Sequence, residues 1–172
     1  MPRPVSTEAE LLDRALALLS RRAHSRSELL NKLRRYQPSD EQLGAVLARL
    51  EQAGWLDDAR FARDLADSMV RRGRTGPARI RASLRGHGVP AEQTAAAMAD
   101  TAAEVSADDW LESCRAVARD RVRRGLSLQD PRDRARLQRF LLGRGFTHAM
   151  ISPVIRELGA QLDEDGQEPP TD

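Results

Sequence analysis

The chain has 172 residues, of which 40% are hydrophobic, 3% are aromatic and 31% carry a charge. This length can bury a working core, and the scarcity of β-branched and aromatic residues favours helices over strands. The single Cys114 excludes an internal disulfide and a cysteine-based zinc site, and we expect it to be a buried structural thiol. No stretch has the apolar length of a membrane span or of a secretion signal, so we expect a cytoplasmic protein.

A three-helix unit occurs three times along the chain. Its markers are an Arg-Arg pair, then two aliphatic residues four positions apart, then a closing segment with the i, i+3, i+4, i+7 spacing of one helix face. The Arg-Arg pairs are Arg21-Arg22, Arg71-Arg72 and Arg123-Arg124, and the aliphatic pairs are Leu29/Leu33, Ile80/Leu84 and Leu137/Leu141. The closing faces are Leu43, Val46, Leu47, Leu50; Thr94, Ala97, Met98, Thr101; and Ile151, Val154, Ile155, Leu158. The leading faces are Leu12, Ala15, Leu16, Leu19; Phe61, Leu65, Met69; and Leu111, Cys114, Ala118, Val122.

These markers predict an all-α fold of three tandem three-helix repeats, stacked into an elongated, curved body. We expect the repeats at residues 1–54, 55–105 and 106–162, with a disordered start at 1–6. Residues 163–172 hold five acids and no basic residue, and we expect a disordered tail there. Either Pro153 lies inside the last helix and kinks it, or Ser152 caps a shorter helix that starts at that proline. Capping-box sequences mark three helix starts: Thr7-x-x-Glu10, Ser25-x-x-Glu28 and Ser39-x-x-Gln42.

Sequence motifs for catalysis are absent: the chain has no phosphate-binding glycine loop, no zinc-protease helix and no serine nucleophile elbow. The acidic pairs Asp57-Asp58 and Asp108-Asp109 stand at predicted helix starts, where free amides and the helix dipole favour them. We therefore expect no enzyme, no catalytic residue, no metal and no cofactor. Three histidines lack a second ligand at metal-binding spacing and are interpreted as surface or cap residues: His24, His87 and His148.

Arginine dominates the charged residues, since Lys32 is the only lysine. Guanidinium groups suit carboxylates and phosphates, so we predict that the second and third repeats bind an acidic or polyanionic partner. Contact with nucleic acid would reach phosphates, without sequence selectivity. The simpler alternative, that these arginines only solvate helix faces and helix C-termini, stays open. The candidates are Arg71, Arg72, Arg74, Arg79, Arg81, Arg85, Arg115, Arg119, Arg123 and Arg124.

Three segments resemble the RecX family, the regulators of the RecA recombinase. One is Leu50-x-x-x-Gly54-Trp55-Leu56-Asp57-Asp58-x-Arg60-Phe61-Ala62, and a second is Gly76-Pro77-x-x-Ile80-x-x-x-Leu84-x-x-x-Gly88-Val89. The third is Ala15-Leu16-x-Leu18-Leu19-x-Arg21-Arg22-x-His24-Ser25-x-x-Glu28-Leu29. The resemblance covers about residues 10 to 160. Trp55 stands where the family commonly has tyrosine and His87 where lysine is common, and the acidic tail lies outside the pattern.

The resemblance implies three three-helix repeats that bind in the deep groove of the RecA–single-stranded DNA filament. It implies that filament extension, strand exchange, ATP hydrolysis and co-protease activity are inhibited, which belongs to homologous recombination, DNA repair and the SOS response. Some members also bind DNA. We expect a monomer whose Trp55–Ala62 segment locks the first repeat onto the second. Two alternatives stay open, a DNA-binding helical transcription regulator and a general helical scaffold.

Overall fold

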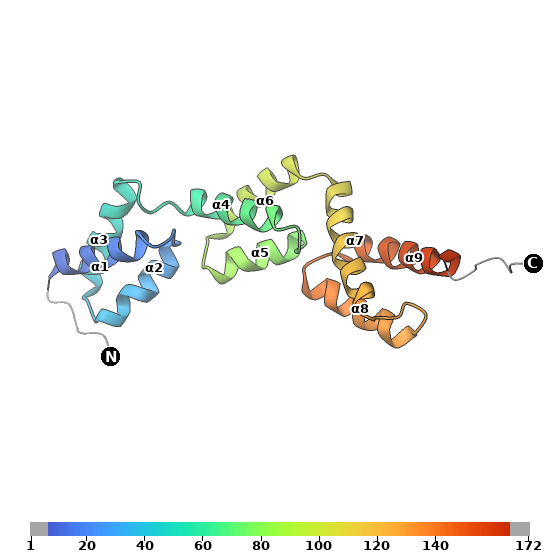
Figure 1. Cartoon of the computed structure of the whole chain (residues 1–172). Coiled ribbons are helices and arrows are strands. Elements are labelled where there is room, and N and C mark those ends of the chain that lie inside the picture. The colour runs from blue at the N-terminus through green and yellow to red at the C-terminus, as the bar shows by residue number, and fades with distance from the viewer. Residues whose placement is uncertain (1–6, 166–172) are drawn as a thin grey trace, which may run out of the picture. The chain divides into compact units, whose positions relative to one another are not determined.

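The computed structural model describes residues 7–165, and this range contains helices and no strand (Figure 1). The all-α prediction is confirmed, with three α-helices where each repeat was expected. The elements are α1 (Glu8–Leu19), α2 (Arg26–Leu33), the 3-10 helix η1 (Arg34–Tyr36), α3 (Asp40–Gln52), α4 (Asp58–Arg71), α5 (Pro77–Gly86), α6 (Ala91–Glu104), α7 (Ala107–Arg123), α8 (Pro131–Gly143) and α9 (His148–Asp165).

The chain divides into two compact units. Unit 1 consists of Met1–Ala66 with Ser83–Asp100, and unit 2 consists of Asp67–Ala82 with Thr101–Asp172. The division passes through α4, α5 and α6, so the second three-helix segment contributes to both units. Each unit thus contains helices from neighbouring segments of the sequence.

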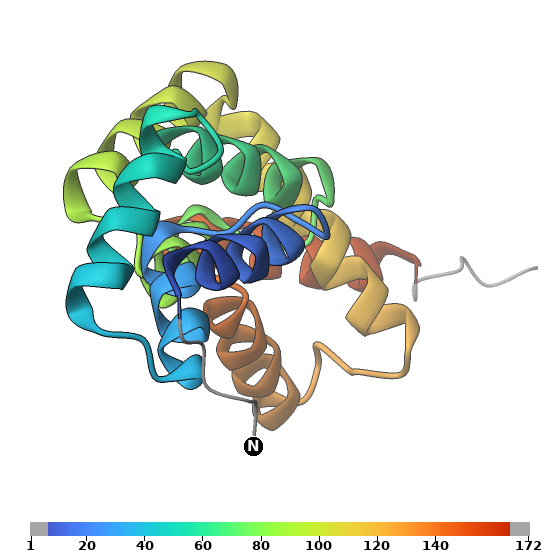
Figure 2. The same ribbon diagram turned by 90° about the vertical axis from the view of Figure 1, so that its left-hand side faces the viewer.

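The core of unit 1 lies among α1, α2 and α3, which pack against one another (Figure 2). The aliphatic pair Leu29/Leu33 and the predicted face of α3 are buried, as expected. On α1 the face is shifted: Leu11 joins Ala15 in the core, while Leu12 is only partly buried. The apolar stripe of α1 is broader than the predicted face, which included Leu12 and omitted Leu11. The core residues are Leu11, Ala15, Leu29, Leu33, Leu43, Val46, Leu47, Leu50 and Leu56.

The core of unit 2 lies where α7 packs against α8 and α9. Leu128, from the loop between α7 and α8, is also buried. It anchors this loop, which is longer than the loop between α4 and α5. Cys114 is fully buried, as predicted, and burial raises the pKa of its thiol to about 11. The core residues are Cys114, Ala118, Leu128, Leu137, Leu141, Phe146, Ile151, Val154 and Leu158.

The predicted helix starts are confirmed by their capping hydrogen bonds. The hydroxyls of Thr7, Ser25 and Ser39 accept the backbone N–H of the residue three positions later. Gln42 completes a full capping box with Ser39, and Asp109 does so with Ser106. These bonds satisfy amides that have no partner within the helix.

The C-terminal helix α9 begins at His148 and contains Pro153, so the alternative in which a shorter helix starts at that proline is wrong. The Met150 N–H donates to Thr147 Oγ1 at 3.3 Å, and the Ser152 hydroxyl donates to the His148 carbonyl at 2.9 Å. Helix α9 continues to Asp165, three residues into the segment predicted as tail. The remainder, 166–172, lies outside the described residues, as do residues 1–6.

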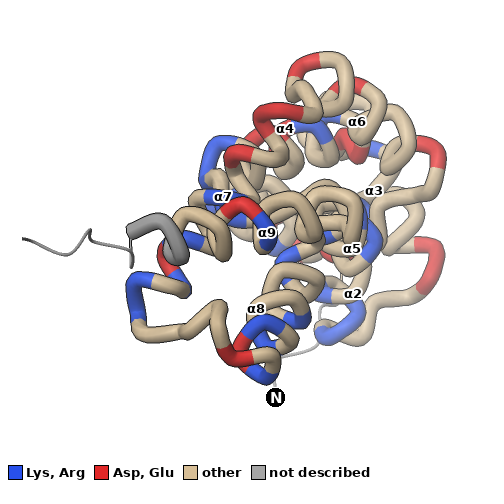
Figure 3. Tube along the Cα trace, turned by 90° about the vertical axis from the view of Figure 1, so that its right-hand side faces the viewer, with Lys and Arg blue, Asp and Glu red and all other residues tan. Residues whose placement is uncertain are grey.

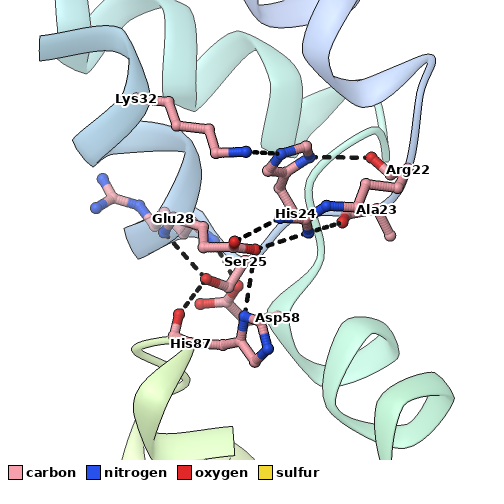
Figure 4. A network of polar contacts seen from close by, with 9 residues as sticks. Arg22, Ala23, His24, Ser25, Glu28, Lys32, Asp58 and His87 are labelled. Carbon is pink, nitrogen blue, oxygen red and sulfur yellow. Dashed lines mark hydrogen bonds and ion pairs between the residues drawn. The ribbon is translucent and has the colours of Figure 1, made fainter. Parts of the chain in front are cut away.

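In each unit, the turn between the second and third helices of one segment contacts the start of the second helix of the preceding segment. We call this arrangement the docked turn. In unit 1, the Ser25 hydroxyl donates to the His87 carbonyl, which belongs to the turn between α5 and α6 (Figure 4). In unit 2, the Gly76 N–H donates to the Arg144 carbonyl at 2.9 Å, and the turn between α8 and α9 supplies that carbonyl. The same contact therefore recurs at corresponding positions.

Candidate anion-binding site

Unit 2 gathers arginines around one cavity, which we call the arginine pocket. Its volume is about 270 Å³, and it lies among the α4–α5 junction, α7 and the end of α8. Figure 3 shows the basic residues along α7 and α8. The lining residues are Arg72, Gly73, Arg74, Ala116, Val117, Asp120, Arg123, Phe140 and Arg144.

Local backbone geometry brings the α4–α5 junction to the pocket. Helix α4 ends because Gly73 adopts a φ of 60°, and its N–H donates to the Val70 carbonyl at 2.8 Å. Three residues later, Gly76 is tied to the Arg144 carbonyl by the docked turn. Because a Cβ on Gly76 would lie 2.3 Å from the Gly145 oxygen, only glycine permits this approach. The junction is therefore held beside the end of α8.

The Phe140 ring of the pocket contacts two arginines, Arg144 in the lining and Arg121 outside it. The guanidinium carbon of Arg121 lies 4.1 Å from the centre of the Phe140 ring, and that of Arg144 lies 5.1 Å from it. Guanidinium groups are attracted to the face of such a ring by its quadrupole. Phe140 packs against the unit 2 core, so it gives Arg144 a fixed support.

The pocket has more positive charge than its own residues neutralise. Among the described residues, Arg72, Arg74 and Arg123 have no ion-pair partner. The one carboxylate in the lining, Asp120, lies 3.1 Å from Arg124, which carries a further positive charge. Several guanidinium forks converging on a small cavity form a site for a phosphate or a carboxylate group.

Other predicted arginines have different surroundings. Arg115 bonds to Glu112 and to Glu157 of α9, and Arg119 lies 3.7 Å from Glu112. These two guanidiniums are thus engaged within unit 2. The remaining four are exposed and do not line the pocket: Arg71, Arg79, Arg81 and Arg85.

Arg144, Arg121 and Phe140 were missing from the sequence-predicted set. The signal that could have found Arg144 is its repeat position, since it lies three residues after Leu141 as His87 lies three residues after Leu84. His87 and Arg144 are the residues whose carbonyls accept the docked-turn hydrogen bonds. Neither composition nor helix periodicity identifies such a turn as a contact between segments.

The interpretation of His24 as a surface or cap residue is wrong. Its side chain belongs to a buried network in unit 1 and is 4% exposed (Figure 4). Nδ1 lies 3.0 Å from the Arg22 carbonyl oxygen and Nε2 lies 2.8 Å from the Lys32 amine. Burial lowers the pKa of His24, which favours the neutral ring. His148 is exposed, as predicted, and His87 is half-buried beside Glu28.

The Trp55–Ala62 segment was predicted to lock the first repeat onto the second. It does contact the first repeat, but not through its tryptophan. The Arg26 N–H donates to Asp58 Oδ1 at 2.7 Å, and Leu56 is buried in the unit 1 core. Within the second repeat, the ring of Phe61 packs edge-on against His87. Trp55 is 61% exposed. Gly54 supplies the positive φ of this turn and Leu56 enters the core, so the indole between them lies outside the core.

A larger and more open groove, of about 750 Å³, lies between α8 and α9. Its lining includes Arg134 and Arg156 but no aromatic ring, so its positive charge is sparser than that of the arginine pocket. Among residues 7–161, whose side chains the structure describes, no group of three histidine, cysteine or acidic side chains is placed to hold a metal ion. No helix within residues 7–165 has both the length and the hydropathy to cross a membrane.

Comparison with protein families matches three consecutive domain models along the chain. The first, second and third three-helix domains of RecX match residues 12–50, 57–98 and 107–155. The regulatory protein RecX of Stenotrophomonas maltophilia (strain R551-3) is 42% identical over 148 residues, covering 84% of this chain and 85% of that protein. The regulatory protein RecX of Ralstonia nicotianae is 38% identical over 172 residues, covering 98% of each chain.

Solved structures show the same fold. The crystal structure of RecX from Lactobacillus salivarius aligns with a TM-score of 0.73 at 20% identity, covering 88% of this chain and 96% of that one. A second crystal structure of a regulatory protein RecX aligns with a TM-score of 0.74 at 22% identity, covering 86% of this chain and 72% of that one.

Proposed function

This chain belongs to the RecX family of regulatory proteins, and we propose that it binds the filament that RecA forms on single-stranded DNA. In this proposal the chain lies in the deep groove of the filament. There it inhibits filament extension, strand exchange, ATP hydrolysis and co-protease activity. The observation that supports the proposal is the arginine pocket, whose unpaired guanidiniums suit a nucleoprotein polyanion.

The proposed inhibition requires the chain to occupy the filament groove and requires no catalysed reaction. A body anchored in the groove by charge-assisted hydrogen bonds takes up space that incoming duplex DNA needs. It also holds neighbouring RecA subunits in one arrangement, which slows the conformational changes coupled to ATP hydrolysis. Arginine contacts of this kind reach phosphates or acidic side chains without reading bases, so the proposed inhibition does not depend on DNA sequence.

The test is RecA's DNA-dependent ATP hydrolysis, measured with sub-stoichiometric amounts of this protein. The wild-type chain is expected to lower the rate. The double variant Arg74→Glu/Arg123→Glu should need at least about tenfold more protein for the same inhibition, because two guanidinium contacts are replaced by repulsion. Salt titration of binding to naked single-stranded DNA adds a second readout, since each lost phosphate contact flattens the slope of log affinity against log salt by about 0.7.

The matched control is Arg35→Glu/Arg49→Glu, which makes the same charge change at exposed arginines of unit 1. This variant should inhibit like the wild type. If the wild-type chain leaves ATP hydrolysis unchanged, the proposed function is wrong. If instead it binds one duplex sequence preferentially, the transcription-regulator alternative is favoured. Equal inhibition by both double variants would show that the arginine pocket does not contribute to inhibition.

A further inference from the structure

Trp55 is the one large hydrophobic side chain within residues 7–161 that is strongly exposed, at 61%. Its backbone is nevertheless fixed on both sides. Gly54 adopts a φ of 71° at the end of α3, and the Trp55 N–H donates to the Leu50 carbonyl at 2.9 Å. The next residue, Leu56, is buried in the unit 1 core. The indole is therefore presented from a rigid turn, which lowers the entropy that a contact with a partner would cost.

A cavity of about 270 Å³ adjoins the indole, and we call it the Trp55 pocket. Its apolar part is formed by Leu19 at the end of α1, Ala23 in the loop between α1 and α2, and Phe61 near the start of α4. Its polar rim is formed by Asp57, Arg60 and Asp64. All of the lining belongs to unit 1: Leu19, Ala23, His24, Gly54, Trp55, Asp57, Arg60, Phe61 and Asp64.

The charge of this rim is opposite to that of the arginine pocket. Asp57 accepts the Arg60 N–H with Oδ1 at 2.9 Å, and its second oxygen has no partner among the described residues. Asp64 lies 3.9 Å from the Arg60 guanidinium, and both side chains are more than 60% exposed, so this ion pair is weak. Burial lowers the pKa of His24 in the lining, which favours its neutral ring. Two carboxylates thus face one loosely paired cation.

We propose that the Trp55 pocket binds an arginine or lysine side chain presented by a protein partner. The methylene stem of that side chain packs on Leu19 and Phe61, and its charged end lies over the indole face within reach of Asp57 and Asp64. A DNA phosphate is the wrong ligand here, since two carboxylates would repel it. The inference rests on the proposed function, because it makes RecA itself, rather than DNA, the component of the filament that unit 1 contacts.

The experiment compares the binding of full-length variants to two probes, RecA–single-stranded DNA filaments and the same DNA without RecA. Trp55→Ala should weaken filament binding by at least about tenfold, as loss of a central aromatic contact does. Trp55→Phe, which keeps an aromatic face, should restore most of the affinity. Asp64→Asn should weaken filament binding by about threefold. None of the three should change binding to naked DNA, and Gln52→Ala, an exposed neighbour on α3, should behave as the wild type.

Each pattern of results decides the inference. Filament binding by Trp55→Ala at the wild-type affinity overturns it while the proposed function stands. A parallel loss of naked-DNA binding also overturns it, because Trp55 would then stack on bases. A wild-type chain that does not bind filaments overturns the proposed function and this inference with it. Melting temperatures of the variants should equal that of the wild type, since the indole lies outside the core.

Discussion

The hydroxyl of Ser25 donates a hydrogen bond to the backbone carbonyl of His87, 62 residues further along the chain. The same hydroxyl accepts the Glu28 N–H at 3.1 Å, so one side chain both caps α2 and receives the turn between α5 and α6. In unit 2, the Gly76 and Ala78 N–H groups donate to the Arg144 and Gly145 carbonyls. The docked turn thus joins the start of a second helix to the following segment in both units.

We predict that the glycines of the docked turns tolerate no side chain. A Cβ on Gly145 would lie 2.2 Å from the Arg79 backbone nitrogen, and one on Gly88 would lie 2.3 Å from Ser27 Oγ. Gly145→Ala and Gly88→Ala should each lower the free energy of unfolding by about 2–4 kcal/mol, since strain at positive φ adds to overpacking. Urea denaturation measures this change.

The control is Gly125→Ala, which also has a positive φ, of 95°, but has nothing within 4 Å of the added Cβ. It should cost about 1 kcal/mol, the strain of the backbone alone. Equal losses at Gly125 and Gly145 would show that the close approach contributes nothing.

Gln37 occupies the corresponding turn of the first segment, since it follows Leu33 by four residues as Gly88 follows Leu84. Its φ is 55°, and its side chain is exposed. Because the Gln37 side chain is exposed, its Cβ fits at this turn without a close contact. We predict that Gln37→Gly raises the free energy of unfolding by about 1 kcal/mol, because only left-handed strain is removed. A destabilising effect in thermal or urea unfolding would contradict this account.

Glu28 should make stability depend on pH. The bidentate hydrogen bonds from Arg22, at 2.6 and 3.0 Å, lower the pKa of this carboxyl from its ordinary value of 4.5 to about 2, and His87 and His24 also face it. The folded-state pKa is depressed, so the stabilisation is fully present above about pH 4.5 and is lost as pH falls towards 2. Its size is about 3 kcal/mol at most.

The measurement is the free energy of unfolding from pH 7 to pH 2. Glu28→Gln should be less stable than the wild type at pH 7 and should converge with it near pH 2. Glu51→Gln is the matched control, because Glu51 and its partner Arg26 are both nearly half exposed and should contribute little. A constant difference between wild type and Glu28→Gln at every pH would refute the assignment.

Cys114 should be unreactive in the folded protein. The residue is fully buried, and burial raises the pKa of its thiol to about 11, whereas reaction requires an accessible thiolate. We expect reaction with a thiol reagent such as Ellman's reagent at pH 8 to occur only through unfolding. The rate should therefore rise with urea in parallel with the unfolded fraction. Stoichiometric labelling within seconds in the absence of urea would contradict burial.

Helix periodicity predicted the core accurately where the face is narrow. Every member of the predicted α3 face, Leu43 to Leu50, is buried, as are Thr94, Ala97, Met98 and Thr101 on α6. On α4 the prediction was less successful: Phe61 is buried, but Leu65 and Met69 are only partly so, and the small residues Ala62 and Ala66 face inward instead. Small residues let helices approach closely, and the four-residue spacing of Phe61, Leu65 and Met69 passed over both alanines.

The sequence by itself determined the local structure and the family. Caps, glycine turns and a threefold pattern act between residues close in the chain, so their physics can be read without coordinates. The tertiary structure decided which charges are already paired and which aromatic is exposed. Ion pairs such as Arg115 with Glu157, and the pocket that joins Arg72 to Arg144, depend on distances between helices, which spacing along one helix does not contain. Trp55 is exposed for the same reason, because neighbours from α1 and α3 fill the core without it.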